Sequence, residues 1–189
     1  MKKKLVNYSL IFLSAVTMFM LTVGMPAYAV TNTFTDVKKG SYYYDAVIEL
    51  SNKGIVEGAQ ATNFGVDREA TRAEAAYFIA NALNLDTKNV KDPGFTDVPK
   101  TSKYYGAIAA LANLKIINGY GNGKFGPNDT LERYAIAKML TIAFELDTST
   151  KVNLPFKDLT STVLTPEIKG YIQTLVDYSI TNGTSTTTF

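Results

Sequence analysis

The sequence predicts an all-α protein built from tandem helix-loop-helix repeats. A short motif returns at a fixed spacing, apolar residues recur at helical intervals beside it, and segments rich in Gly, Asn and Asp separate the helices. One helix pair cannot bury its apolar stripe alone, so neighbouring units must supply the missing surface. We expect a pseudo-threefold helical bundle with an incomplete third repeat, and an open solenoid is the alternative.

The repeat is marked by residues 34–37 (FTDV), 95–98 (FTDV) and 156–159 (FKDL), which are spaced by 61 residues. The third copy then slips by three residues, because Phe189 follows Phe125 by 64. The sequence ends there, where the first two copies continue into a second helix. We therefore expect complete units at 30–90 and 91–152 and a truncated unit at 153–189, whose first helix lacks its partner. This ending suggests a fragment or a truncated gene product.

Each complete unit is expected to contain two amphipathic helices. The first helix is predicted over 42–53 in copy one and 166–178 in copy three, with Gly54 as a left-handed cap. The second is predicted to begin near Thr71 in copy one and near Thr130 in copy two. The predicted apolar stripes are Tyr43, Ala46, Val47 and Leu50 on the first helix, Ala75, Phe78, Ile79 and Ala82 on the second, and Ile136, Met139, Leu140 and Ala143 on its counterpart.

The N-terminus has the pattern of a secretory signal. Three lysines follow Met1, an apolar stretch runs to Met25, and an Ala-Tyr-Ala sequence closes at Ala29. Residues 1–29 are therefore predicted to be a signal peptide, in preference to a membrane anchor, because the apolar run is short for a span of about 20 residues. The mature protein is expected to be secreted and to have no membrane contact after cleavage.

Composition excludes several classes of function. The chain has no Cys and no His, which removes thiol nucleophiles, His-based triads and most zinc sites. Three of the 19 basic residues and none of the 17 acidic ones precede residue 30, so the remainder is nearly neutral and nucleic acid is not an expected partner. We expect no metal, no cofactor and no catalysis. Asp67 and Glu69 resemble a hydrolytic acid pair only in composition, since acids are ordinary before a helix.

Residues 71–74 (TRAE) have the spacing of a capping box, with Thr71 and Glu74 as the reciprocal pair. Arg72 at the first helical position opposes the helix dipole, and Arg133 recurs 61 residues later. Such an arginine either binds an anionic partner or forms a structural ion pair with Glu69 or Glu132. Copy two reads ERYA at 132–135, where Asp129 and Glu132 have the spacing of a substitute box.

The order of these motifs resembles the S-layer homology domain from Phe34 to Phe189. The motifs are Phe-x-Asp-Val, paired tyrosines, an apolar helix, a Gly-containing loop, Phe-Gly-Pro and Thr-Arg-Ala-Glu. Copy one has Val66 where the family usually has Pro, copy two keeps Pro127 but not the full TRAE motif, and copy three ends before it. The resemblance implies three units around a pseudo-threefold axis in a bacterial surface protein.

The resemblance also implies non-covalent attachment to secondary cell-wall polysaccharide, commonly carrying pyruvate ketals. The motif arginines, here Arg72 and Arg133 with the neighbours Thr71 and Glu74, would contact the acidic sugar in grooves between units. A guanidinium can hold a ketal carboxylate with two parallel hydrogen bonds.

Paired tyrosines, among them Tyr44 and Tyr105, could pack on sugar rings, and core packing is the alternative. The amides near Gly58 and Gly119 could face the ligand, and a tight turn is the alternative. The sequence therefore predicts anchoring of a secreted surface protein to the bacterial cell wall. The alternative is a protein-interaction or lattice-forming module that self-associates in a surface layer without binding glycan.

Overall fold

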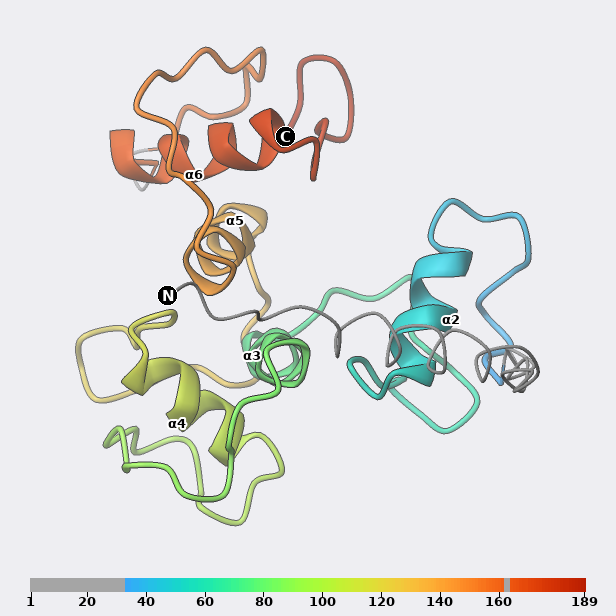
Figure 1. Cartoon of the computed structure of the whole chain (residues 1–189), viewed down its shortest axis with the longest axis vertical. Coiled ribbons are helices and arrows are strands. Elements are labelled where there is room, and N and C mark those ends of the chain that lie inside the picture. The colour runs from blue at the N-terminus through green and yellow to red at the C-terminus, as the bar shows by residue number, and fades with distance from the viewer. Residues whose placement is uncertain (1–32, 162–163) are drawn as a thin grey trace, which may run out of the picture. The chain divides into compact units, whose positions relative to one another are not determined.

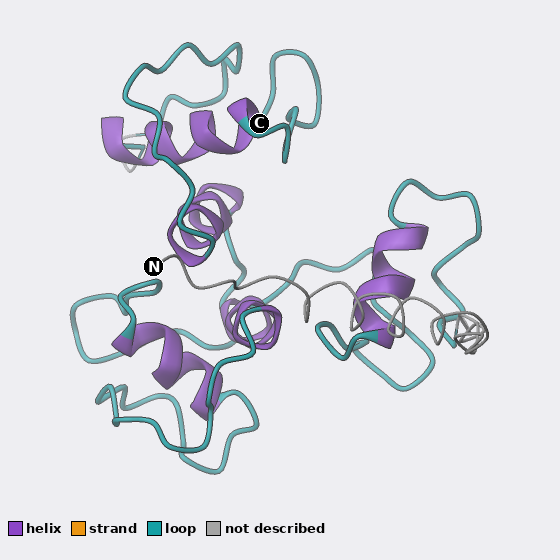
Figure 2. Cartoon of the chain, viewed as in Figure 1, coloured by secondary structure: helices purple, strands orange, loops and turns teal. Residues whose placement is uncertain are grey.

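The computed structural model describes residues 33–161 and 164–189, and within them it confirms the all-α class (Figures 1 and 2). The predicted signal peptide at 1–29 lies outside the described residues. Within the described ranges there is no strand, and none of the helices is long and apolar enough to cross a bilayer. The helices are α2 (Tyr44–Asn52), α3 (Arg72–Ala82), α4 (Tyr105–Asn113), α5 (Arg133–Ala143) and α6 (Pro166–Asp177).

The helices pair across units rather than within them. α3, the second helix of copy one, packs against α4, the first helix of copy two, and α5 packs in the same way against α6. α3 and α5 also contact each other. The expectation that the first helix of copy three lacks a partner was therefore wrong, because α6 is covered by the preceding unit. In the described part of the chain, α2 is the helix that packs against no other helix.

An aspartate in each copy fastens the loop that follows the first helix. The carboxylate of Asp97 accepts hydrogen bonds from the main-chain amides of Phe125 and Gly126, both at 2.8 Å. Asp36 does the same for Phe64, Gly65 and Val66, and Asp158 does so for Phe189. A pair of phenylalanine rings accompanies each aspartate, with centroids 5.4, 5.4 and 5.5 Å apart: Phe34 with Phe64, Phe95 with Phe125, and Phe156 with Phe189.

Helix boundaries agree with the expected ones in copy one but not in copy two. Gly54 follows α2 with φ of +68°, as predicted for a left-handed cap. α5 begins at Arg133 and not near Thr130. The cause is a short antiparallel junction, in which Thr130 bridges to Thr71 and the Leu131 amide donates to the Ala70 carbonyl at 2.9 Å. This pairing holds residues 130–131 extended until the helix can start.

The predicted apolar stripes are only partly buried. On α2 the structure buries Val47 and Ile48, while Ala46 and Leu50 are exposed. On α3, Phe78 is half-buried and Ala82 is exposed. The counterparts one unit later, Ala107, Leu111, Met139 and Ala143, are all buried. The expectation that both copies bury the same face was wrong, because no described helix lies on that side of α2 and α3.

We expect acid to loosen these loops. Burial would raise the pKa of the Asp97 carboxyl, but the amides of Phe125 and Gly126 outweigh it and hold the pKa below its ordinary value of 3.8. A carboxyl with a lowered folded-state pKa stabilises the fold above pH 4 and loses that contribution as the pH falls through the folded-state value.

Urea denaturation of Asp97→Asn should therefore show lower stability than the wild type at pH 7 and a smaller difference between pH 7 and pH 3. An unchanged difference would assign the acid sensitivity to other carboxylates.

Candidate functional site

Arg72 is placed by the capping box that opens α3, as the sequence predicts. The Thr71 hydroxyl accepts a hydrogen bond from the Glu74 amide at 3.2 Å, and the Glu74 carboxylate accepts one from the Thr71 amide at 2.9 Å. Arg68 donates two further hydrogen bonds to the Glu74 carboxylate, at 2.8 and 2.7 Å. Burial raises the pKa of Glu74, but Arg68 and the Thr71 amide together lower it below its ordinary value, so the cap stays ionised.

A main-chain junction between copies directs Arg72 toward the second unit. The Arg72 amide donates to the Asp129 carbonyl at 2.9 Å, and the Ala73 amide donates to the Pro127 carbonyl at 3.1 Å. The first free amides of α3 are therefore satisfied by the loop of copy two rather than by solvent. The site is assembled from two copies, and neither copy contains it alone.

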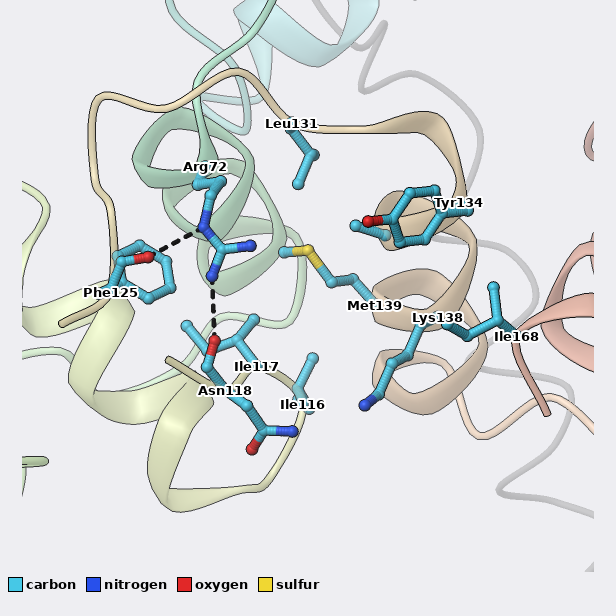
Figure 3. Close-up of a pocket in the computed structure, with 11 residues that line it drawn as sticks. Arg72, Ile116, Ile117, Asn118, Phe125, Leu131, Tyr134, Lys138, Met139 and Ile168 are labelled. Carbon is cyan, nitrogen blue, oxygen red and sulfur yellow. Dashed lines mark hydrogen bonds between the residues drawn. The ribbon is translucent and has the colours of Figure 1, made fainter. Parts of the chain in front are cut away.

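The Arg72 side chain lies on the loop of copy two without meeting a carboxylate. Its Nε donates to the Phe125 carbonyl at 2.9 Å and its Nη2 donates to the Asn118 carbonyl at 3.0 Å (Figure 3). The guanidinium carbon lies 4.6 Å from the centre of the Phe125 ring and 4.9 Å from that of Tyr120. Among the described residues Arg72 forms no ion pair, so the structural pair with Glu69 or Glu132 is not formed. Its charge is held in place but not neutralised.

Arg72 borders a cavity of about 200 Å³ between α3, the copy-two loop and α5. Figure 3 shows Arg72 on one side of this space, with Tyr134 and Lys138 of α5 on the other. Its lining contains two cationic side chains and no carboxylate: Arg72, Ile116, Ile117, Asn118, Phe125, Leu131, Tyr134, Ala135, Lys138, Met139 and Ile168. We call this space the Arg72 cavity. It can accept a small anionic group that also carries apolar surface.

Tyr120 fixes one wall beside the guanidinium. Its hydroxyl donates to the Asp129 carboxylate at 2.8 Å, and this hydrogen bond, followed by burial, raises the pKa of the Tyr120 phenol. Tyr120 therefore stays protonated and neutral at physiological pH, and its ring remains in contact with Arg72. The corresponding position in copy one is Ala59, so this wall is a feature of copy two.

Arg133 lies in a different environment, although it occupies the equivalent helical position. It is exposed, its guanidinium carbon is 5.0 Å from the centre of the Phe189 ring, and it lines a cavity of about 380 Å³. Two carboxylates, Glu132 and Asp158, line that same cavity. The expected substitute box is absent, because Glu132 makes no capping bond and Asp129 accepts from Tyr120. An anion would be less favoured here than at Arg72.

The tyrosines and glycines named from the sequence lie away from the Arg72 cavity. Tyr44 packs with Val47 and Ile48, and Tyr105 packs on the larger core with its phenol beside Asp92. A Cβ atom on Gly58 would lie 2.6 Å from the Phe34 ring, and one on Gly119 would lie 2.6 Å from the Phe95 ring. The structure thus gives these four residues packing contacts, of the kind that the alternative explanations require.

Sequence reasoning missed Tyr134, Lys138 and Ile168 as cavity residues. The signal for the first was Tyr134 itself, a large side chain directly after Arg133 where copy one has Ala73. Lys138 follows four residues later, on the same helical face. Ile168 comes from α6 and could not be foreseen before the pairing of α5 with α6 was known. In the described residues no group of three or more His, Cys, Asp or Glu side chains is placed to hold a metal ion.

Comparison with known proteins places these motifs in a family. Residues 33–76 and 94–133 match the family model of the S-layer homology domain. The chain is 38% identical over 138 residues to the S-layer protein sap of Bacillus anthracis, and 34% identical over 146 residues to the surface-layer 125 kDa protein of Lysinibacillus sphaericus. It is also 31% identical over 152 residues to an endoglucanase of Bacillus sp. (strain KSM-635).

These alignments cover most of this chain but little of each relative. They span 71%, 77% and 77% of this chain, and 16%, 12% and 16% of the respective relatives. The likeness therefore extends to one portion of proteins that otherwise differ, two surface-layer proteins and a glucanase.

Proposed function

Since this chain belongs to the S-layer homology domain family, we propose that it is a non-catalytic module that attaches to the bacterial cell wall by binding an acidic secondary polysaccharide in the Arg72 cavity. The same type of segment occurs in relatives named for surface layers and in one named for glucan hydrolysis. A function common to all of them is attachment at the cell surface, where this chain acts, rather than any single enzymatic activity.

The observation that carries the proposal is an oriented cationic group without an anionic partner in an apolar cavity. Two carbonyls and two aromatic rings hold the Arg72 guanidinium, and its Nη1 is left to meet a ligand. Lys138 supplies a second positive charge across the cavity. A carboxylate attached to a sugar, such as a pyruvate ketal, offers both the negative charge and the apolar surface that this lining favours.

Arg72 is proposed as the principal contact and Arg133 as a minor one. The cavity at Arg133 is lined by Glu132 and Asp158, which repel an anion, and its arginine is exposed to solvent that screens the interaction. Thr71 and Glu74 act through the cap that positions Arg72. For Tyr44, Tyr105, Gly58 and Gly119, the contacts favour packing over contact with the ligand.

We expect Arg72→Ala to weaken binding to wall polysaccharide by about ten- to hundredfold, since hydrogen bonds to a charged group contribute that much to affinity. Arg133→Ala is the matched control and should weaken it only a few-fold. Cosedimentation with purified sacculi measures both, with thermal denaturation alongside, because Arg72 also satisfies two carbonyls and its loss will lower stability.

The ligand is identified by three preparations: intact sacculi, sacculi stripped of polysaccharide with acid, and polysaccharide lacking pyruvate. Binding should need the polysaccharide and fall when pyruvate is removed. Full retention on stripped peptidoglycan would reject polysaccharide binding. Equal losses for the two arginine variants, per folded molecule, would reject the assignment to Arg72.

A further inference from the structure

α2 and α3 each present an apolar face that no described helix covers. The face on α2 consists of Ala46 and Leu50, and Leu50 is 36% exposed. The face on α3 consists of Phe78 and Ala82. None of these four side chains belongs to the apolar clusters that form the core. We call the two faces together the α2/α3 face, and it lies outside the Arg72 cavity.

The same positions one unit later show what such a face packs against. Ala107 and Leu111 on α4 are buried in one cluster with Ala76, Ile79 and Ala80 of α3. Met139 and Ala143 on α5 are buried in that cluster too. Each covered face therefore meets the second helix of a preceding unit, which is α3 in both cases. The uncovered faces of α2 and α3 are the counterparts for which no described second helix exists.

One contact ties the two faces to a common junction. The Asn81 side chain of α3 donates a hydrogen bond from Nδ2 to the carbonyl of Ile55, just after α2, at 3.2 Å. The last turn of α3, with Phe78 and Ala82, is thereby joined to the segment that leaves α2. A single helix that ran past this junction could reach both faces, as α3 does for α4 and α5.

We propose that the α2/α3 face binds one amphipathic helix supplied by another polypeptide of this family, in the place that a further second helix would take. The chemistry of the partner follows from α5, which presents Ala137, Met139, Thr141 and Ala143 as its buried residues. These side chains are small or flexible, so the helix axes can approach closely. The four receiving residues carry no charge, which favours an apolar partner face over an acidic or basic one. This interaction is independent of polysaccharide binding.

The test adds a synthetic peptide of residues 130–147 to the full chain. We expect saturable one-to-one binding by calorimetry, a gain of helical circular dichroism beyond the sum of the components, and a higher Tm for the chain. Helix formation reports on docking, because a peptide of this length is barely helical in water. Leu50→Arg should weaken binding by about tenfold or more, since burial of one leucine changes a binding constant by that order.

Leu114→Arg is the matched control, because Leu114 is an exposed leucine at the end of α4, outside the α2/α3 face. It should bind the peptide as the wild type does. The proposal is overturned if the peptide does not bind, if both arginine variants bind equally, or if Leu50→Arg dissociates a stable dimer of the free chain. Equal binding would mean that the peptide exchanges with α5 itself, and the dimer would mean that a second copy already covers the face.

Discussion

Replacing Leu111 with alanine should lower the free energy of unfolding by about 2–5 kcal/mol, whereas the same replacement at Leu50 should cost less than about 1 kcal/mol. The two leucines hold equivalent positions, 61 residues apart, on the first helices of copies one and two. Leu111 is 0% exposed and packs in the cluster between α3 and α4, while Leu50 is 36% exposed. The removed atoms are identical, so the difference measures only what covers each helix.

Urea denaturation at pH 7 with far-UV circular dichroism measures both variants under one set of conditions. Comparable losses at the two positions would mean that α2 is covered in solution, for example by self-association, and analytical ultracentrifugation would then detect the assembly. A small loss at Leu111 would contradict the pairing of α3 with α4. Because the slope of the transition should be unchanged, the midpoints can be compared directly.

The repeat and the local structure could be read from the sequence, because both depend on residues close together in the chain. The capping box of Thr71 and Glu74 needs only four consecutive residues, and Gly54 needs only its own freedom at positive φ. Glu132 shows the limit of this reasoning. Its spacing from Asp129 allowed a second box, but the junction with copy one keeps the segment extended and Tyr120 occupies Asp129.

The pairing of helices could not be read from the sequence. The apolar stripe of α6 is the same whether its partner lies in its own unit or in the preceding one, and the structure shows the preceding one. The Arg72 cavity follows from that pairing, since it needs α3, the loop of copy two, α5 and Ile168 of α6. For the same reason the sequence treated Arg72 and Arg133 as equals, whereas Glu132 and Asp158 distinguish their surroundings.

Gly119→Ala should lower the free energy of unfolding by about 1–3 kcal/mol, the usual cost of forcing extra volume into a packed site. A Cβ atom here would lie 2.6 Å from the Phe95 ring and would also collide with the main-chain carbonyl of Lys124. Neither can retreat freely, because Phe95 is stacked on Phe125 and Lys124 is tied to Tyr120 by a hydrogen bond of 2.9 Å.

Thermal and urea denaturation, measured beside polysaccharide binding per folded molecule, separate packing from ligand contact at this glycine. Gly58→Ala is the internal comparison, since its Cβ would meet Phe34 in the same way. If Gly119 serves packing, stability falls and the affinity of the remaining folded molecules changes only as far as the neighbouring Asn118 carbonyl moves Arg72. Unchanged stability with a large loss of affinity would instead place the Gly119 amide in direct contact with the polysaccharide, and the Arg72 cavity would then extend further along the copy-two loop than its lining residues indicate.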